Sequence, residues 1–255
     1  FGLWARGRLR TTAPPVETPP LIESVRASLA HRSFLALAGS FMLFNLGYQM
    51  LVAFLPYYLV VTLGRSENDV TYFTGGVISA ALLALPFLTF AARRVTKRAL
   101  YAGSMAALGA YLLFLTVGAF RPLIPGIDLF SQSVALISLS GLGFAALFVF
   151  PGAMVADVID DDSRRTGQGR AAIFYGMFKT LEKIAQAGAI VLLGLLFALF
   201  GNTSEQPLGI QLAMPVGGAC VLAGFAAVFL FYHLRESPRD AAEAVAPAPA
   251  EAPTG

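Results

Sequence analysis

The sequence predicts an all-α membrane protein with six transmembrane helices. Of its 255 residues, 56% are hydrophobic and only 13% are charged, and the mean hydropathy is +0.69. A soluble domain needs a polar shell that this composition cannot supply. Six apolar stretches are also long enough to cross a hydrocarbon core, which takes about 20 helical residues. Composition and span length together therefore define the expected fold class.

The six predicted spans are joined by short connections and flanked by polar ends. We expect a cytoplasmic linker over 1–33, a transmembrane unit over 34–233 and a disordered cytoplasmic tail over 234–255, because both ends are rich in Pro and Ala or Arg. Within the linker, ESVRASLAHRSF, from Glu23, has the pattern of a short amphipathic helix at the membrane surface. The predicted spans are 34–63, 71–92, 99–120, 129–156, 171–200 and 212–233.

Lysine and arginine are distributed unevenly between the two sides of the membrane. Alternating the spans places fourteen of the 18 cationic residues on the side of the termini, and only Arg65 and Arg121 on the other. Because cytoplasmic loops carry the excess of positive charge, we expect both termini to be cytoplasmic in the cell inner (plasma) membrane. The net charge of +3 is spread over these loops, so no basic patch is large enough to bind nucleic acid.

Polar side chains form a stripe inside the fifth span. At 100° per residue they share one face, and the most central lysine lies about 18 Å along the helix, near the middle of a core about 30 Å thick. A lipid-facing charge at that depth costs roughly 2.5–3.5 kcal/mol. The stripe must therefore face a substrate or ion cavity, or form an interhelical ion pair without a transport role. Its members are Tyr175, Lys179, Glu182, Lys183 and Gln186.

The first span carries a second polar face, made of Asn45, Tyr48 and Gln49. Amide and phenol groups at this spacing can hydrogen-bond a hydroxyl-rich ligand, or they can join neighbouring helices. Both interpretations remain open from the sequence.

Carboxylates follow the fourth span in DVIDDDSRRTGQGR. Asp157 and Asp160 are expected at the cytoplasmic end of that helix, where a negative charge opposes the helix dipole and requires cations nearby. We therefore predict a cytoplasmic charge network. The expected cationic members are Arg93, Arg94, Arg164 and Arg165.

Residue patterns for catalysis are missing from the sequence. It contains no Ser/His/Asp or Cys/His set, no phosphate-binding glycine loop and no cluster with metal-ligand spacing, and Cys220 is the single cysteine. The sequence thus predicts neither an enzyme nor a metal site.

Residues 151–201 carry a family resemblance in PGAMVADVIDDDSRRTGQGRAAIFYGMFKTLEKIAQAGAIVLLGLLFALFG. This stretch resembles the glycoside-pentoside-hexuronide:cation symporter family, the melibiose-carrier-like branch of the major facilitator superfamily. That family has an Asp-x-x-Asp stretch ending helix ten, then a Thr-Gly-x-Arg loop, then a Phe and a Lys in helix eleven before a Gly-Tyr end. Departures here are Ala171-Ala172 in place of Glu-Gly, and Asn202 in place of Tyr. The matching positions are Asp157, Asp160, Thr166, Gly167, Phe178, Lys183 and Gly201.

The resemblance implies that the chain is the C-terminal half, helices 7–12, of a twelve-helix transporter. FGLWARGR, which opens the chain and looks like the end of a preceding helix, favours the same expectation. The implied function is cation-coupled symport of a sugar or glycoside by alternating access, with the substrate near the midplane. Ligands for the coupling Na⁺ or H⁺ would lie mostly in the N-terminal half, and no other cofactor is expected. The alternatives are a lysolipid or amphiphile carrier of the same superfamily and a six-helix structural or channel subunit.

Overall fold

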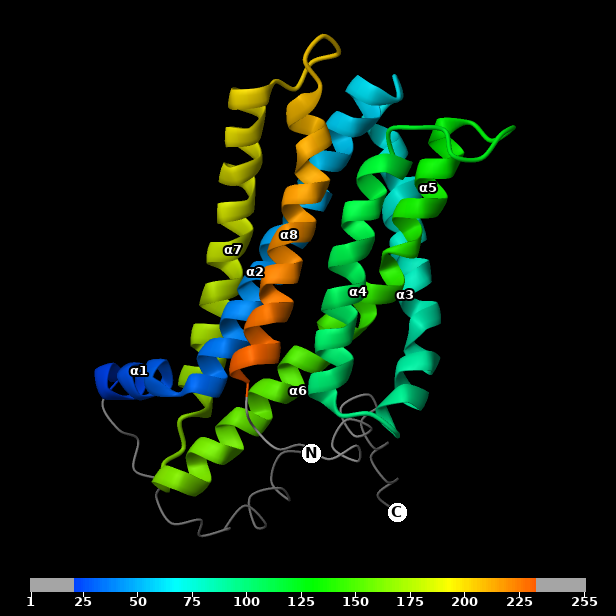
Figure 1. Ribbon diagram of the computed structural model, residues 1–255. Coiled ribbons are helices and arrows are strands. Elements are labelled where there is room, and N and C mark those ends of the chain that lie inside the picture. Colours follow the sequence, from blue (N-terminus) through cyan, green and yellow to red (C-terminus); the bar gives the residue numbers. More distant parts are fainter. Residues whose placement is uncertain (1–20, 233–255) are drawn as a thin grey trace, which may run out of the picture.

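The computed structural model describes residues 21–232, which form a bundle of long helices (Figure 1). Six helical segments within them are long and apolar enough to cross a membrane, which confirms the predicted fold class. The tail predicted over 234–255 and residues 1–20 of the predicted linker lie outside the described residues. The helices are α1 Leu21–Ala30, α2 Arg32–Tyr57, α3 Val70–Ala92, α4 Lys97–Gly118, α5 Leu129–Leu139, α6 Gly141–Thr166, α7 Ala171–Phe200 and α8 Leu208–Phe231.

α1 is a short helix that lies across the ends of the long helices, beside the start of α7 (Figure 1). It overlaps the amphipathic segment predicted from Glu23, but it ends at Ala30, and the last three residues of that segment belong to α2. The chain then turns at His31, whose Nδ1 accepts a hydrogen bond of 3.3 Å from the backbone N–H of Phe34 and so caps α2. This cap satisfies one of the amide groups that every helix start leaves unpaired.

α2 is extended by a π-helical turn, Tyr58–Thr62, just after Pro56. Proline has no N–H to donate, so the regular ladder is interrupted there and the following turn widens. The hydroxyl group of the buried Tyr58 lies 2.6 Å from Oγ of Ser133 on α5 and donates to the carbonyl of Ala119. These contacts tie the C-terminal end of the first span to the end of α4 and to α5.

The fourth span differs from the prediction in two ways. It is broken at Ser140 into α5 and α6, whereas we expected one unbroken helix over 129–156. The break lies where α6 crosses α3 closely: a Cβ on Gly141 would come within 2.2 Å of the carbonyl oxygen of Val77. In addition, α6 continues to Thr166, so DVIDDDSRRT is helical rather than a connection. Gly167, with φ +68°, ends the helix in the left-handed conformation that glycine adopts readily.

α8 lies between α2 and α4 and packs along both, while α7 packs on α2 (Figure 1). Close approach depends on glycine: a Cβ on Gly47 of α2 would lie 2.5 Å from the carbonyl oxygen of Gly217 on α8. α6 packs against α3 and α4. Much of α3 and α7 is consequently left uncovered by the rest of the described chain, as the exposed side chains of Leu83, Phe87 and Leu199 show.

The loop between α4 and α5 is fixed by two polar side chains. Gln132 is buried, and its amide nitrogen donates to the carbonyls of Gly118 and Arg121 at 2.6 and 2.8 Å. Asp128 caps α5 by accepting hydrogen bonds from the backbone N–H and the hydroxyl of Ser131, at 3.0 and 2.7 Å. These bonds lower the pKa of Asp128 from its ordinary value, the side-chain bond from Ser131 being the largest cause.

Candidate functional site

Four side chains of the polar stripe of α7 form one connected set. Nζ of Lys179 lies 2.8 Å from Oε2 of Glu182. The other oxygen of Glu182 accepts a hydrogen bond of 3.3 Å from the amide of Gln186, and Gln186 in turn accepts one of 3.1 Å from Lys183. At the start of the stripe, the hydroxyl of Tyr175 donates to the carbonyl of Gly152 on α6 at 3.3 Å. The helical spacing thus brings Lys179, Glu182, Lys183 and Gln186 into contact, whereas Tyr175 contacts α6.

The stripe carries an uncompensated positive charge. Glu182 pairs with Lys179, whereas the described residues give Lys183 no carboxylate within ion-pair distance, only the neutral Gln186. The side chain of Lys179 is 66% exposed and Lys183 is also exposed, so both cationic groups point away from the described bundle. The side chain of Glu182, by contrast, is only 16% exposed. A cation at this position can attract an anionic group from a ligand or from additional protein.

An aromatic groove lies beside the stripe, between α2, α3 and α6. Tyr48 lines it and contacts Phe144 and Phe148 edge-to-face, with ring centroids 4.9 and 5.5 Å apart. The groove has a volume of about 280 Å³ and is otherwise apolar. Since α6 and α7 run in opposite directions and meet at Gly152 and Tyr175, Phe148 and Lys179 each lie one turn further into the membrane from that contact. The groove and the stripe are therefore at similar depths.

The two amides predicted on the first span occupy different surroundings. Asn45 is 2% exposed, and its side chain donates to the carbonyl of Phe41 one turn earlier, at 2.9 Å. It stabilises α2 from within, so the structure does not place it in the groove. Gln49 is half-buried on the neighbouring side of α2, next to Tyr48 in the sequence.

Asp157 and Asp160 on α6 do not pair with the arginines that the sequence suggested. Asp157 lies well before the end of α6, so the expected conflict with the helix dipole does not arise. Its oxygens instead lie 2.8 and 2.6 Å from Nζ of Lys97, a 5% exposed residue in the first turn of α4. Asp160, about one turn further along α6, is exposed. The predicted arginine partner of Asp157 is therefore wrong: Asp157 pairs with Lys97, a buried lysine of RRVTKR.

The four predicted arginines are all at the surface. The guanidinium group of Arg94 stacks on the ring of Phe90, 4.9 Å from its centroid, and Arg165 lies 3.5 Å from Asp161 one turn earlier on α6. Arg93 and Arg164 are exposed, and the described residues provide neither with an ion pair. In the described residues, none of the four arginines forms an ion pair with Asp157 or Asp160.

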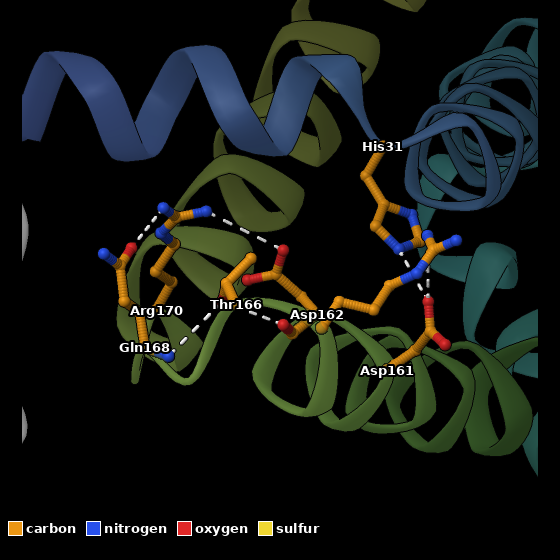
Figure 2. A network of polar contacts seen from close by, with 7 residues as sticks. His31, Asp161, Asp162, Thr166, Gln168 and Arg170 are labelled. Atoms are coloured by element: carbon orange, nitrogen blue, oxygen red, sulfur yellow. Dashed lines mark hydrogen bonds and ion pairs between the residues drawn. The ribbon is translucent and has the colours of Figure 1, made fainter.

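A polar cluster at the end of α6 joins three segments of the chain (Figure 2). Nε2 of His31 lies 3.2 Å from Oδ2 of Asp161. Because Nδ1 of His31 accepts the bond from Phe34, the ring proton must be on Nε2, which therefore donates to Asp161. His31 connects α1, α2 and α6, and its ring also meets Phe174 of α7 edge-on, with centroids 6.2 Å apart.

The loop that follows α6 is held by Arg170 (Figure 2). Its guanidinium group lies 3.8 Å from Oδ1 of Asp162, both side chains being only 8% exposed, and donates to the side-chain oxygen of Gln168. The hydroxyl of Thr166 donates to the carbonyl of Asp162 at 2.9 Å. We did not predict Asp161, Asp162, Arg170 or His31 as network members. The spacing of the carboxylates was the one sequence signal for this cluster. It assigns them to helix faces only if α6 continues to Thr166, which we did not expect.

Six helical segments long and apolar enough to cross a membrane, one of which carries an exposed charged stripe, indicate a multi-pass membrane protein. The chain belongs to the MFS/sugar transport protein family, whose model matches residues 8–236. This match confirms the resemblance seen in residues 151–201 and the all-α fold of the major facilitator superfamily.

Two curated proteins illustrate the range of its relatives. The chain is 27% identical over 192 residues to an uncharacterized symporter of Synechocystis, an alignment that covers 75% of this chain and 34% of that protein. It is 22% identical over 227 residues to a sodium-dependent lysophosphatidylcholine symporter of Danio rerio, covering 86% of this chain and 41% of that protein. The chain thus spans less than half the length of either relative.

Proposed function

We propose that residues 34–233 form the C-terminal six-helix half of a cation-coupled secondary transporter, and that the α7 stripe lines its central solute path. A sugar or glycoside is the proposed substrate, in keeping with the family to which the chain belongs. The observation that carries the proposal is the outward orientation of Lys179 and Lys183 on a membrane-spanning helix.

The energetic argument rests on what the stripe can face. Two cations at this depth would cost roughly 5–7 kcal/mol against lipid, at 2.5–3.5 kcal/mol each. Glu182 offsets one of them, which leaves Lys183 without a charged partner. An N-terminal six-helix half would place protein and an aqueous cavity on this side, as alternating access between two halves requires. The acidic ligands of the coupling Na⁺ or H⁺ would lie mostly in that half.

In the proposed orientation, the protein spans the cell inner membrane and both termini are in the cytoplasm. The support is the positive charge at the end of α3, at the start of α4, at the end of α6 and on α1. The clusters around Lys97–Asp157 and Asp162–Arg170 would then lie near the cytoplasmic surface. There they can stabilise one state of the transport cycle.

A second substrate class is favoured by the aromatic groove. Its lining is apolar except for Tyr48, which suits an acyl chain better than a polyhydroxylated ring. An amphiphile could place its chain in this groove and the phosphate of its headgroup on the lysines at the same depth. One relative is named for lysophosphatidylcholine transport, which supports this alternative.

Uptake by the full-length transporter in sealed vesicles tests the proposal. Radiolabelled sugars, glycosides and lysophosphatidylcholine are supplied one at a time, with and without an imposed Na⁺ gradient and, separately, a proton gradient. We expect gradient-driven accumulation of at least one sugar or glycoside. Accumulation of the lysolipid alone would favour the second class, and accumulation of neither would contradict cation-coupled transport of these solutes.

The stripe itself is tested by Lys183→Ala, with Ile184→Ala as the matched control. Both side chains are exposed on the same turn of α7, but they point about 100° apart. Removing a charge makes α7 easier to insert, so loss of activity cannot be attributed to failed insertion. We expect Lys183→Ala to lower uptake per inserted molecule at least tenfold and Ile184→Ala to retain it. Equal uptake by both variants would reduce the stripe to a structural role.

A further inference from the structure

A groove of about 480 Å³ opens between the first turns of α2 and the last turns of α8. Its lining combines small residues at its base, Ala36 and Ala227, with larger side chains, Leu35 and Phe231, which are 43% and 60% exposed. All four are apolar and lie in membrane-spanning helices. In a bilayer this surface faces hydrocarbon, so a lipid chain can fill it without displacing ordered water.

Arg32 stands at the mouth of this groove, in the first turn of α2. It is exposed, and in the described part of the chain its guanidinium group has no ion pair. Asp161, which pairs with the preceding residue His31, is held by His31 and Arg165 at 3.2 and 3.5 Å. The groove therefore presents a cation that lacks a counter-charge, at the end of the span where lipid headgroups begin.

We propose that this groove is a phospholipid site, in which Arg32 binds the phosphate and one acyl chain occupies the space between α2 and α8. The planar guanidinium group can donate two parallel hydrogen bonds to a phosphodiester. Lipids with a net negative charge are preferred, because a zwitterionic headgroup brings its own cation to Arg32. The site is on the side of α2 that packs on α8, so it is distinct from the proposed solute path and does not depend on that function.

Native mass spectrometry of the purified full-length protein tests the site. The protein is titrated with phosphatidylglycerol and, separately, with phosphatidylcholine of the same acyl chains. We expect the first phosphatidylglycerol to bind several times more tightly than phosphatidylcholine, and Arg32→Gln to weaken it roughly fivefold, the effect of about one cation near a headgroup. The matched control is Arg121→Gln, an exposed arginine at the opposite membrane surface, which should leave the preference intact.

A second measurement locates the lipid. Phosphatidylglycerol with a photoactivatable group on its acyl chain should label the segments around Leu35 and Ala227, and Ala227→Phe should abolish this labelling by filling the groove while Arg32 remains. A preference for phosphatidylglycerol that survives Arg32→Gln would overturn the proposal. So would labelling that appears only after deletion of residues 233–255, since the tail itself would then be the normal occupant.

Discussion

Glu182 links the two halves of the α7 stripe, because its carboxylate oxygens face different partners. One oxygen lies 2.8 Å from the ammonium of Lys179 and the other accepts from Gln186, which also contacts Lys183. Its side chain is only 16% exposed, so it is the least hydrated charge of the set. The carboxylate therefore orients both lysines, and its removal should affect more than one residue.

Glu182→Gln should destabilise the membrane-embedded protein, because Lys179 and Lys183 would then repel each other without an intervening anion. Since Lys179 is largely exposed, the loss should be modest, about 0.5–1 kcal/mol. Adding Lys179→Gln should restore most of it by removing the repulsion. The measurement is the midpoint of thermal unfolding in one detergent for the three variants. A double variant less stable than Glu182→Gln would contradict this account.

Asp128 should contribute stability in a pH-dependent way through its cap on α5. Its pKa is lower in the folded protein than in the unfolded chain, so its contribution is complete above the unfolded value of about 4 and is lost as the pH falls through the lower folded value. We expect Asp128→Ala to lower the unfolding midpoint at pH 7 and Asp128→Asn, an equally good capping residue, to preserve it. The difference between wild type and Asp128→Ala should shrink below pH 4.

Next to the break between α5 and α6, the first residue of α6 packs closely against α3. Gly141 has no space for a side chain, whereas a Cβ on Gly152, further along the same helix, would meet no atom within 4 Å. Gly141→Ala should therefore cost about 1–3 kcal/mol through overpacking. Gly152→Ala, the matched control, should be neutral or stabilising by up to about 1 kcal/mol, owing to its higher helix propensity. Chemical denaturation in mixed micelles compares them, and equal stability would show that α3 can shift without cost.

The Lys97–Asp157 pair joins α4 to α6 near one membrane surface. Asp157→Asn would leave the nearly buried Lys97 without a counter-charge, and because Asp157 is 30% exposed we expect a loss of about 1–3 kcal/mol. Combining it with Lys97→Met should recover most of the stability, since no unpaired charge then remains. Thermal unfolding of the two single variants and the double variant measures the coupling. Purely additive effects would mean that the pair does not join the helices energetically.

Hydropathy was sufficient to locate the six spans, but not to describe the fourth one. The break at Ser140 lies beside a close approach to Val77, a residue far away in the sequence, which hydropathy cannot reveal. The continuation of α6 to Thr166 was hidden because its last turns are polar and resemble a loop in composition. Lys97 was not recognised as the partner of Asp157, because only the packing of α4 on α6 buries it. The α7 stripe was predictable because its members share one helix.

At the scale of the whole molecule, the distribution of cations predicts its orientation in the membrane. In a full-length background from which Cys220 and any other cysteine have been removed, Thr96→Cys should react with an impermeant maleimide only from the cytoplasmic side, and Ser204→Cys only from the opposite side. Both positions are outside the membrane-spanning helices, between α3 and α4 and between α7 and α8. Reaction of Thr96→Cys from outside intact cells would reverse the proposed topology.

The stripe of α7 also bears on how the chain is made. Residues 184–200 are apolar apart from Gln186, and they reach the lower limit of about 17 residues needed to span a bilayer. A nascent α7 can therefore enter the membrane with Lys179 and Lys183 still at the water boundary. Later docking, in which Phe178 stacks on Phe41 of α2 at 4.5 Å between centroids, would draw the lysines to their final depth. Biogenesis of this helix would then proceed in two stages, with partner helices rather than the translocon setting its register.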